Sequence, residues 1–180
     1  REDTGEIAAA NDDLLPRLIV PSDVKGALHN HTTLSDGDAT LEEMADAARN
    51  IGWKWLGVAD HSPSLKVANG ASAEDLLDQG KKIKQYNAAW ANEGVDFRLF
   101  HGVESDILEG GKLDHPDNVL AELDYVVASV HAMTKWKNRD EVTNTEELIR
   151  CIDHPATNVL GHPTGRILQG RDYMVQCWQA

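Results

Sequence analysis

The sequence is short of cysteine, of basic residues and of long apolar runs. Its two cysteines, Cys151 and Cys177, form neither a CxxC pair nor a disulfide framework, which favours a reducing, cytoplasmic environment. No run of about 18 apolar residues is present, so we expect no membrane span and no membrane partner. The N-terminal residues also lack the basic and apolar segments of a signal peptide.

The shortage of basic residues limits the classes of partner. There are 17 Lys and Arg against 30 Asp and Glu, a formal net charge of −13. This excludes a freestanding DNA-binding module that works through a broad basic face. Carboxylates that ligate divalent cations would explain part of the acidic excess. A solvated acidic surface, which aids solubility, explains the larger part.

Short apolar runs alternate with longer helical patterns. The runs predict buried strands over residues 25–29, 55–61, 97–104, 125–131 and 158–162. Helices are predicted over residues 40–50, 72–92, 117–122 and 145–152, the first with Thr40 and Glu43 as a capping box. Repeated strand–helix–strand units spaced by about 30 residues predict a parallel α/β sheet or barrel.

The first residues differ from the rest. Residues 6–15 have an apolar pattern interrupted by polar residues, and Pro16 ends any helix there. We therefore expect residues 1–20 to be a connector or tail, and residues 21–180 to form one domain.

Each predicted strand ends in side chains that can bind a metal. The carboxyl ends of the strands of a βα barrel meet on one face, where active sites lie. Five separate segments would therefore bring imidazoles and a carboxylate together. These residues are His29 and His31, Asp60 and His61, Glu104, His131 and His162.

The first of these groups is an HxH pair. Side chains at i and i+2 of a strand point to the same side, so His29 and His31 can hold one ion. Asp36, in a Ser-Asp-Gly sequence that is also typical of a plain turn, is close enough to add an oxygen ligand. Glu104 has two oxygens and can bridge two ions, an arrangement suited to phosphoester hydrolysis. Asp60 fits either a ligand or a partner that orients a ligand histidine.

The remaining histidines, His101, His115 and His154, lack this placement, and we interpret them as structural or surface residues. His101 is an odd number of residues from Glu104, so it faces the other side of a regular strand. A phosphate substrate also requires cationic donors. Arg166, which directly follows the predicted ligand His162, is the best candidate; Lys137 and Arg139 are better read as solvated loop charges.

The segments ALHNHTTLSDG, GVADHSPS, FHGVESDIL, VVASVHAM and LGHPTGR resemble the PHP (polymerase and histidinol phosphatase) domain family. LPRLIVPSDVKGALHNHTTLSDG, SPSLKVANG and LGHPTGRILQGR resemble the C-terminal PHP domain of bacterial family X DNA polymerases in particular.

The resemblance implies a distorted, TIM-like (β/α)7 barrel with up to three divalent ions, manganese, zinc or iron. His29, His31 and Glu104 would hold the first ion, and Glu104 would bridge to a second held by His131 and His162. Asp36 and His61 would help to hold a third. Glu104, His131 and Arg166 are the implied catalytic residues. The implied activity is hydrolysis of a phosphoester by metal-activated water, on a DNA 3′ end in the polymerase subgroup.

The chain departs from the family pattern at its C-terminus. The final Asp-x-His motif is absent, and about five βα units precede Ala180, so we expect a truncated domain whose parent carries a polymerase domain. A partial barrel has an open edge, through which a second copy can pair. Three functions stay open: a 3′–5′ exonuclease or 3′-end-processing enzyme, a histidinol-phosphate-type phosphatase, and a non-catalytic, metal-stabilised scaffold module of a polymerase.

Overall fold

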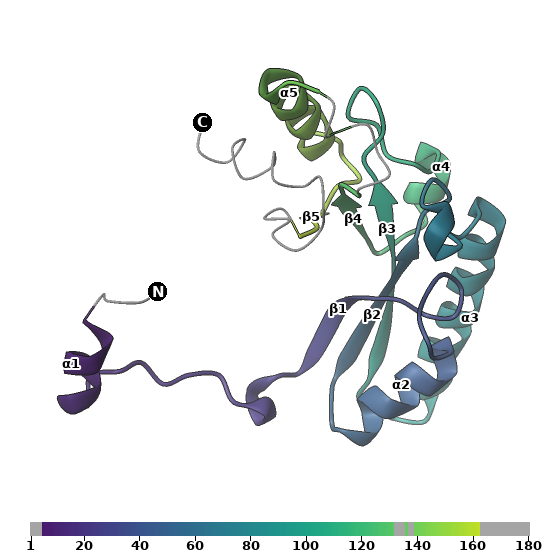
Figure 1. The fold of residues 1–180 in the computed structure, drawn as a ribbon. Helices are drawn as coiled ribbons and strands as arrows, with labels where there is room; N and C mark the ends of the chain where they lie inside the picture. Colours follow the sequence, from purple (N-terminus) through teal and green to yellow (C-terminus); the bar gives the residue numbers. More distant parts are fainter. Residues whose placement is uncertain (1–4, 132–135, 137–138, 163–180) are drawn as a thin grey trace.

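The computed structural model describes residues 5–131, 136 and 139–162, and its centre is a five-stranded parallel sheet. The strands follow one another in chain order across the sheet and curl into a half-barrel (Figure 1). They are β1 (Gly26–Asn30), β2 (Trp55–His61), β3 (Arg98–Asp106), β4 (Tyr125–Ser129) and β5 (Val159–Leu160). The mixed α/β architecture with parallel strands confirms the predicted fold class.

The helices connect successive strands. They are α2 (Leu41–Asn50), α3 (Ala73–Asn92), α4 (Asp117–Leu120) and α5 (Glu141–Ile152), with short 3-10 turns at Pro21–Asp23 and Lys66–Ala68. Thr40 and Glu43 form the predicted capping box at the start of α2, and Ser72 and Asp75 form another at the start of α3. These caps satisfy main-chain N–H groups that the first turn leaves without helical partners.

Helices α2 and α3 cover the same side of the sheet (Figure 1). Every second side chain of the strands points toward these helices. Leu56, Val58 and Leu99 of the strands pack with Ala45 of α2 and Ile83 of α3. Farther along the sheet, a second apolar cluster is built around Val103, Val126, Leu76 and Leu148. The opposite, concave side has a smaller cluster of Ala59, Tyr125 and Val127, with Phe100 packed against it.

Some helix boundaries differ from the prediction, and α4 ends at Leu120 rather than at residue 122. α5 begins at Glu141 rather than at Thr145, because the Asp140 side chain accepts a hydrogen bond from the Thr143 main chain and caps the helix there. Near the N-terminus, α1 (Glu6–Asn11) buries none of its residues and stands apart from the sheet at the end of an extended segment (Figure 1). Within the described part of the chain, no helix is long and apolar enough to cross a membrane.

Candidate metal centre

The carboxylate of Glu104 lies where the ends of all five strands meet. Glu104 pairs with His61 in the β2–β3 register, while His131 and His162 follow β4 and β5. Ring nitrogens approach both carboxylate oxygens. The distances to Oε1 are 3.1 Å from His29 Nε2, 3.4 Å from His131 Nε2 and 2.6 Å from His162 Nε2; those to Oε2 are 3.5 Å from His31 Nε2 and 2.9 Å from His61 Nδ1.

The carboxylate is almost fully enclosed by these rings. Glu104 is 1% exposed, and such burial by itself would raise its pKa. Hydrogen bonds with the surrounding imidazoles, His131 first and then His162, outweigh that effect and hold the pKa of Glu104 far below its usual range. The group is therefore a buried carboxylate that stays ionised, which is the form that ligates a cation.

The HxH pair converges on Glu104 for a different reason from the one that strand alternation gives. His29 has a φ of 64°, in the left-handed region, and the β1–β2 register shifts between Ala27 and Asn30. β1 ends at Asn30, so His31 lies beyond the strand. A bulge with a left-handed residue, rather than a regular i to i+2 repeat, brings both rings to the carboxylate.

Asp36 joins the cluster from the loop after β1. Its carboxylate oxygens lie 3.9 Å from His31 Nδ1 and 3.5 Å from His61 Nε2. The rings of His31 and His61 are stacked, with centroids 4.3 Å apart. Burial first, and then the neighbouring His61 ring, lower the pKa of His31. A lowered pKa favours the neutral imidazole, which is the state in which histidine binds metal.

Asp106 is a member of the site that the sequence analysis missed. Its carboxylate contacts Nδ1 of His131, on the side of the ring away from Glu104. Burial would lower the pKa of His131, but the hydrogen bonds with Asp106 and Glu104 raise it to about 9. The sequence spacing could have predicted this position, because Asp106 is two residues after Glu104 on β3 and therefore lies on the same side of the strand.

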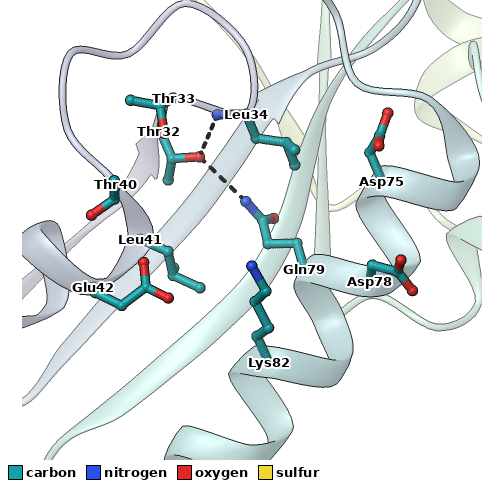
Figure 2. A pocket seen from close by; sticks show the side chains of 10 residues that line it. All are labelled: Thr32, Thr33, Leu34, Thr40, Leu41, Glu42, Asp75, Asp78, Gln79 and Lys82. Carbon is teal, nitrogen blue, oxygen red and sulfur yellow. Dashed lines mark hydrogen bonds between the residues drawn. The ribbon is translucent and has the colours of Figure 1, made fainter.

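Asp60 braces the loop that carries Asp36 instead of orienting a histidine. Its buried carboxylate accepts hydrogen bonds from the Thr32 main chain (2.7 Å), the Thr32 hydroxyl (2.8 Å) and the Ser35 hydroxyl (2.7 Å). From α3, Gln79 donates to Asp60 (2.7 Å) and to the Thr32 hydroxyl (3.4 Å), and Figure 2 shows this amide directed at Thr32 beside a pocket. Asp60 therefore joins α3 to the loop.

The remaining histidines lie away from the centre. His101 packs against Gly80 of α3, on the other side of β3 from Glu104. His115 is buried, and His154 lies 3.5 Å from Asp117.

The loop that carries Lys137 and Arg139 is only partly described. Arg139 is mostly buried and pairs with Glu147, so it is a structural residue rather than a solvated charge. Trp136, 3% exposed, packs in the apolar core and does not line the site. Lys137 and Arg166 lie outside the described residues, as does Cys177.

The residues that converge here fit divalent cations. The donor atoms form three sets, and within each set they lie within 4.8 Å of one another. The sets are His29, His31 and Glu104; His31, Asp36 and His61; and His61, Glu104 and His131. Two ligands of one tetrahedral ion are separated by roughly 3.3 Å, close to the nitrogen–oxygen distances around Glu104. The buried Nδ1 atom of His31 also has no hydrogen-bond partner among the described residues. Buried polar atoms rarely lack a partner, and a cation would satisfy them.

The chain also matches a known family model. A family model described as "PHP domain" matches residues 27–179. That range contains every residue of the cluster, and the match covers well over half of the chain.

The similar proteins include a DNA polymerase and several proteins named as probable phosphatases. The DNA polymerase/3′-5′ exonuclease PolX of Bacillus subtilis is 40% identical over 171 residues, which is 95% of this chain and 28% of PolX. A "Probable phosphatase" of Clostridium botulinum is 36% identical over 74% of this chain and 51% of its own length. Another, from Thermoanaerobacter sp., is 33% identical over 78% of this chain and 55% of its own length. The chain thus spans about a quarter of the polymerase and about half of each phosphatase.

Proposed function

Because this chain belongs to the PHP domain family, we propose that the histidines around Glu104 bind divalent cations and that the site hydrolyses phosphoesters. One observation carries the proposal. A carboxylate that is 1% exposed is approached on both oxygens by five histidine rings that come from the ends of four strands. Such a cluster is unfavourable as a purely structural core, since buried charge without a cationic partner is strongly destabilising.

The proposed ligands follow the three geometric sets. His29, His31 and Glu104 form one; His31, Asp36 and His61 form another; His61, Glu104 and His131 form the third. We propose His162, 2.6 Å from Glu104, as a further ligand beside the third set. Bound divalent ions would activate water and neutralise charge on a phosphoryl group. Manganese, zinc and iron all suit imidazoles mixed with carboxylates.

The chain's own residues have separate tasks in this scheme. Glu104 stays ionised and places one oxygen toward each side of the cluster, so it can serve two ions at once. His131 is held between Glu104 and Asp106, which fixes the direction of its ring. We propose Arg166, outside the described residues, as the cation that binds the phosphate of the substrate.

For the substrate, we favour a DNA 3′ end. The similarity to PolX extends over 95% of this chain, more than the 74% and 78% matched by the two phosphatases. The same similarity supports a polymerase domain as the partner in a longer parent protein. We further propose pairing with a second copy through the sheet edges at β1 and β5, which pair with no further strand among the described residues.

A second candidate is a phosphatase for small phosphomonoesters. It is supported by identities of 36% and 33% to the two proteins named as phosphatases, each over about three quarters of this chain. The net charge of −13 also disfavours an extended DNA-binding surface on this chain, whereas a small ester needs only the metal centre.

The experiment is a metal analysis followed by hydrolysis assays. Protein purified without chelator is analysed for transition metals and then assayed with Mn²⁺ on a 3′-labelled oligonucleotide and on p-nitrophenyl phosphate. We expect more than one ion per chain and release of 3′ nucleotides. The Glu104→Gln variant should lose the bound ions and also the turnover. Glu93→Gln, at an exposed residue at the end of α3, should match the wild type in metal content and turnover.

Each result has a distinct meaning. Cleavage of the small ester alone selects the second candidate. Metal binding that raises the melting temperature without hydrolysis of either ester indicates the scaffold module and overturns the enzymatic proposal. Wild-type activity in Glu104→Gln would refute the proposed role of the cluster.

A further inference from the structure

One tyrosine side chain crosses the concave side of the sheet from β4 to β1. Tyr125 begins on β4, and its ring passes over Gly102 of β3 and Gly57 of β2. A Cβ at Gly102 would lie 2.5 Å from Tyr125 Cε1, and one at Gly57 would lie 2.8 Å from the hydroxyl oxygen. Both neighbouring strands therefore have glycine where the ring crosses them, and only glycine leaves it room.

The hydroxyl at the end of this ring bridges the main chains of β1 and β2. It donates a hydrogen bond to the Val58 carbonyl (3.0 Å) and accepts one from the His29 N–H (3.3 Å). The bridge lies where the β1–β2 register shifts and where His29 adopts a φ of 64°. At the same bulge, the Asn30 amide donates to the Gly57 carbonyl (2.8 Å) and to the Ala27 carbonyl (3.3 Å).

We propose that Tyr125 is a positioning residue for the metal centre, and that its hydroxyl holds the β1 bulge in the form that presents His29 and His31 to Glu104. The inference rests on the proposed metal site. The Tyr125 hydroxyl acts on the site through the main chain of His29, whose N–H donates to it.

The physical reason is the conformation of His29. A left-handed backbone is unfavourable for a residue with a Cβ and persists only where neighbouring groups hold it. The energy of one hydrogen bond and the strain of one such residue are of the same order, so loss of the hydroxyl lets β1 relax toward regular strand geometry. Since successive side chains of a regular strand point to opposite sides, this relaxation turns the His29 ring away from Glu104.

The test compares Tyr125→Phe with Tyr86→Phe. Tyr86→Phe is the matched control, because that hydroxyl also makes a hydrogen bond, 2.7 Å to the exposed Glu42 of α2, outside the cluster around Glu104. Chelator-treated proteins are titrated with Mn²⁺ and with Co²⁺, whose visible absorption reports the ligands around the ion. For Tyr125→Phe we expect roughly 10- to 100-fold weaker binding of at least one ion, by analogy with other residues that orient metal ligands, and a changed Co²⁺ spectrum.

The measurements separate the possible failures. If the wild type binds neither Mn²⁺ nor Co²⁺, the proposed metal site is wrong. If the wild type binds both but Tyr125→Phe has the same affinities and Co²⁺ spectrum, the positioning role is wrong. A metal-free melting temperature close to that of Tyr86→Phe shows that weaker binding does not come from general unfolding.

A second variant keeps the test decisive should Tyr125→Phe fail to fold. Asn30→Ala removes the other side chain that bridges the bulge, from a half-buried position outside the apolar core. The proposal expects weaker Mn²⁺ binding and the same kind of change in the Co²⁺ spectrum. Unchanged binding and an unchanged spectrum in this variant would overturn it.

Discussion

The carboxylate of Asp106 and the imidazole of His131 are in contact through Nδ1, so that Nε2 of the same ring faces Glu104 at 3.4 Å. A carboxylate at Nδ1 accepts a hydrogen bond from the N–H of that nitrogen, so that the lone pair of the neutral ring lies on Nε2. This arrangement, carboxylate to histidine to metal, is common among metal-binding histidines, where the outer carboxylate fixes the tautomer and the direction of the ring.

We expect Asp106→Asn to weaken metal binding by roughly 10- to 100-fold. Asparagine keeps the shape of the side chain, but its amide can present an N–H to Nδ1 and so favour the wrong tautomer of His131. Competition with a coloured chelator measures the affinity. The control is Asp124→Asn, which alters a carboxylate bonded to the His101 main chain before β4, at the other end of the sheet. Equal affinities in the two variants would contradict the role given to Asp106.

Asp60→Asn should reduce the free energy of unfolding by about 3 kcal/mol, because a buried carboxylate that accepts four hydrogen bonds is replaced by a group that cannot accept them all. Urea titration measures the loss. Asp140→Asn is the matched control: that carboxylate caps α5 on the surface, where such a change costs about 1 kcal/mol or less. Similar losses of unfolding free energy in both variants would show that the hydrogen bonds of Asp60 stabilise the fold no more than a surface helix cap does.

His101 predicts how stability depends on acidity. Burial lowers the pKa of His101 from 6.5 to about 4 in the folded protein. The unfolded chain therefore binds a proton more readily than the folded one. The stability linked to this histidine is complete above pH 6.5 and is lost as the pH falls to about 4, by about 3 kcal/mol in total.

The corresponding experiment is urea unfolding of metal-free protein at several pH values between 4 and 7. His101→Leu cannot take up this proton, so its curve should fall less steeply with acidification than that of the wild type. The difference between the two proteins isolates His101 from other titrating groups. Parallel curves over this range would show that His101 does not contribute to acid sensitivity.

The sequence was a good guide to what depends on chain order. Strand runs ending in His29, His61, Glu104, His131 and His162 predicted where the sheet would bring ligands together, and the structure places these five side chains within one cluster. Parallel strands connected by helices must end on the same side, so the convergence follows from topology alone. Their roles as ligands stay a prediction until metal is measured.

The sequence was a poor guide to what depends on contacts between strands. The crossing of Tyr125 over Gly102 and Gly57 requires the register of four strands at once, which spacing along the chain does not specify. The left-handed conformation of His29 arises at a bulge, and no glycine or other turn residue at that position in the sequence predicts it. The role of Asp60 was also not predictable from the sequence, because its hydrogen-bond partners in the loop after β1 and in α3 become neighbours only in the folded protein.

Removal of metal gives the most direct measure of how far the cluster depends on cations. Ions that bind only the folded state stabilise it by about 2.7 kcal/mol at 100 times their dissociation constant. For a chain of this size, that predicts a rise in melting temperature of roughly 5–10 °C when Mn²⁺ is added after chelation. Glu104→Gln should lose this rise, since Glu104 contacts every histidine of the cluster. His154→Gln, which alters a histidine paired with Asp117 outside the cluster, should keep it. Equal melting temperatures for chelated and Mn²⁺-loaded wild type would mean that the folded chain gains nothing from the ions, and the donor atoms around Glu104 would then need another explanation.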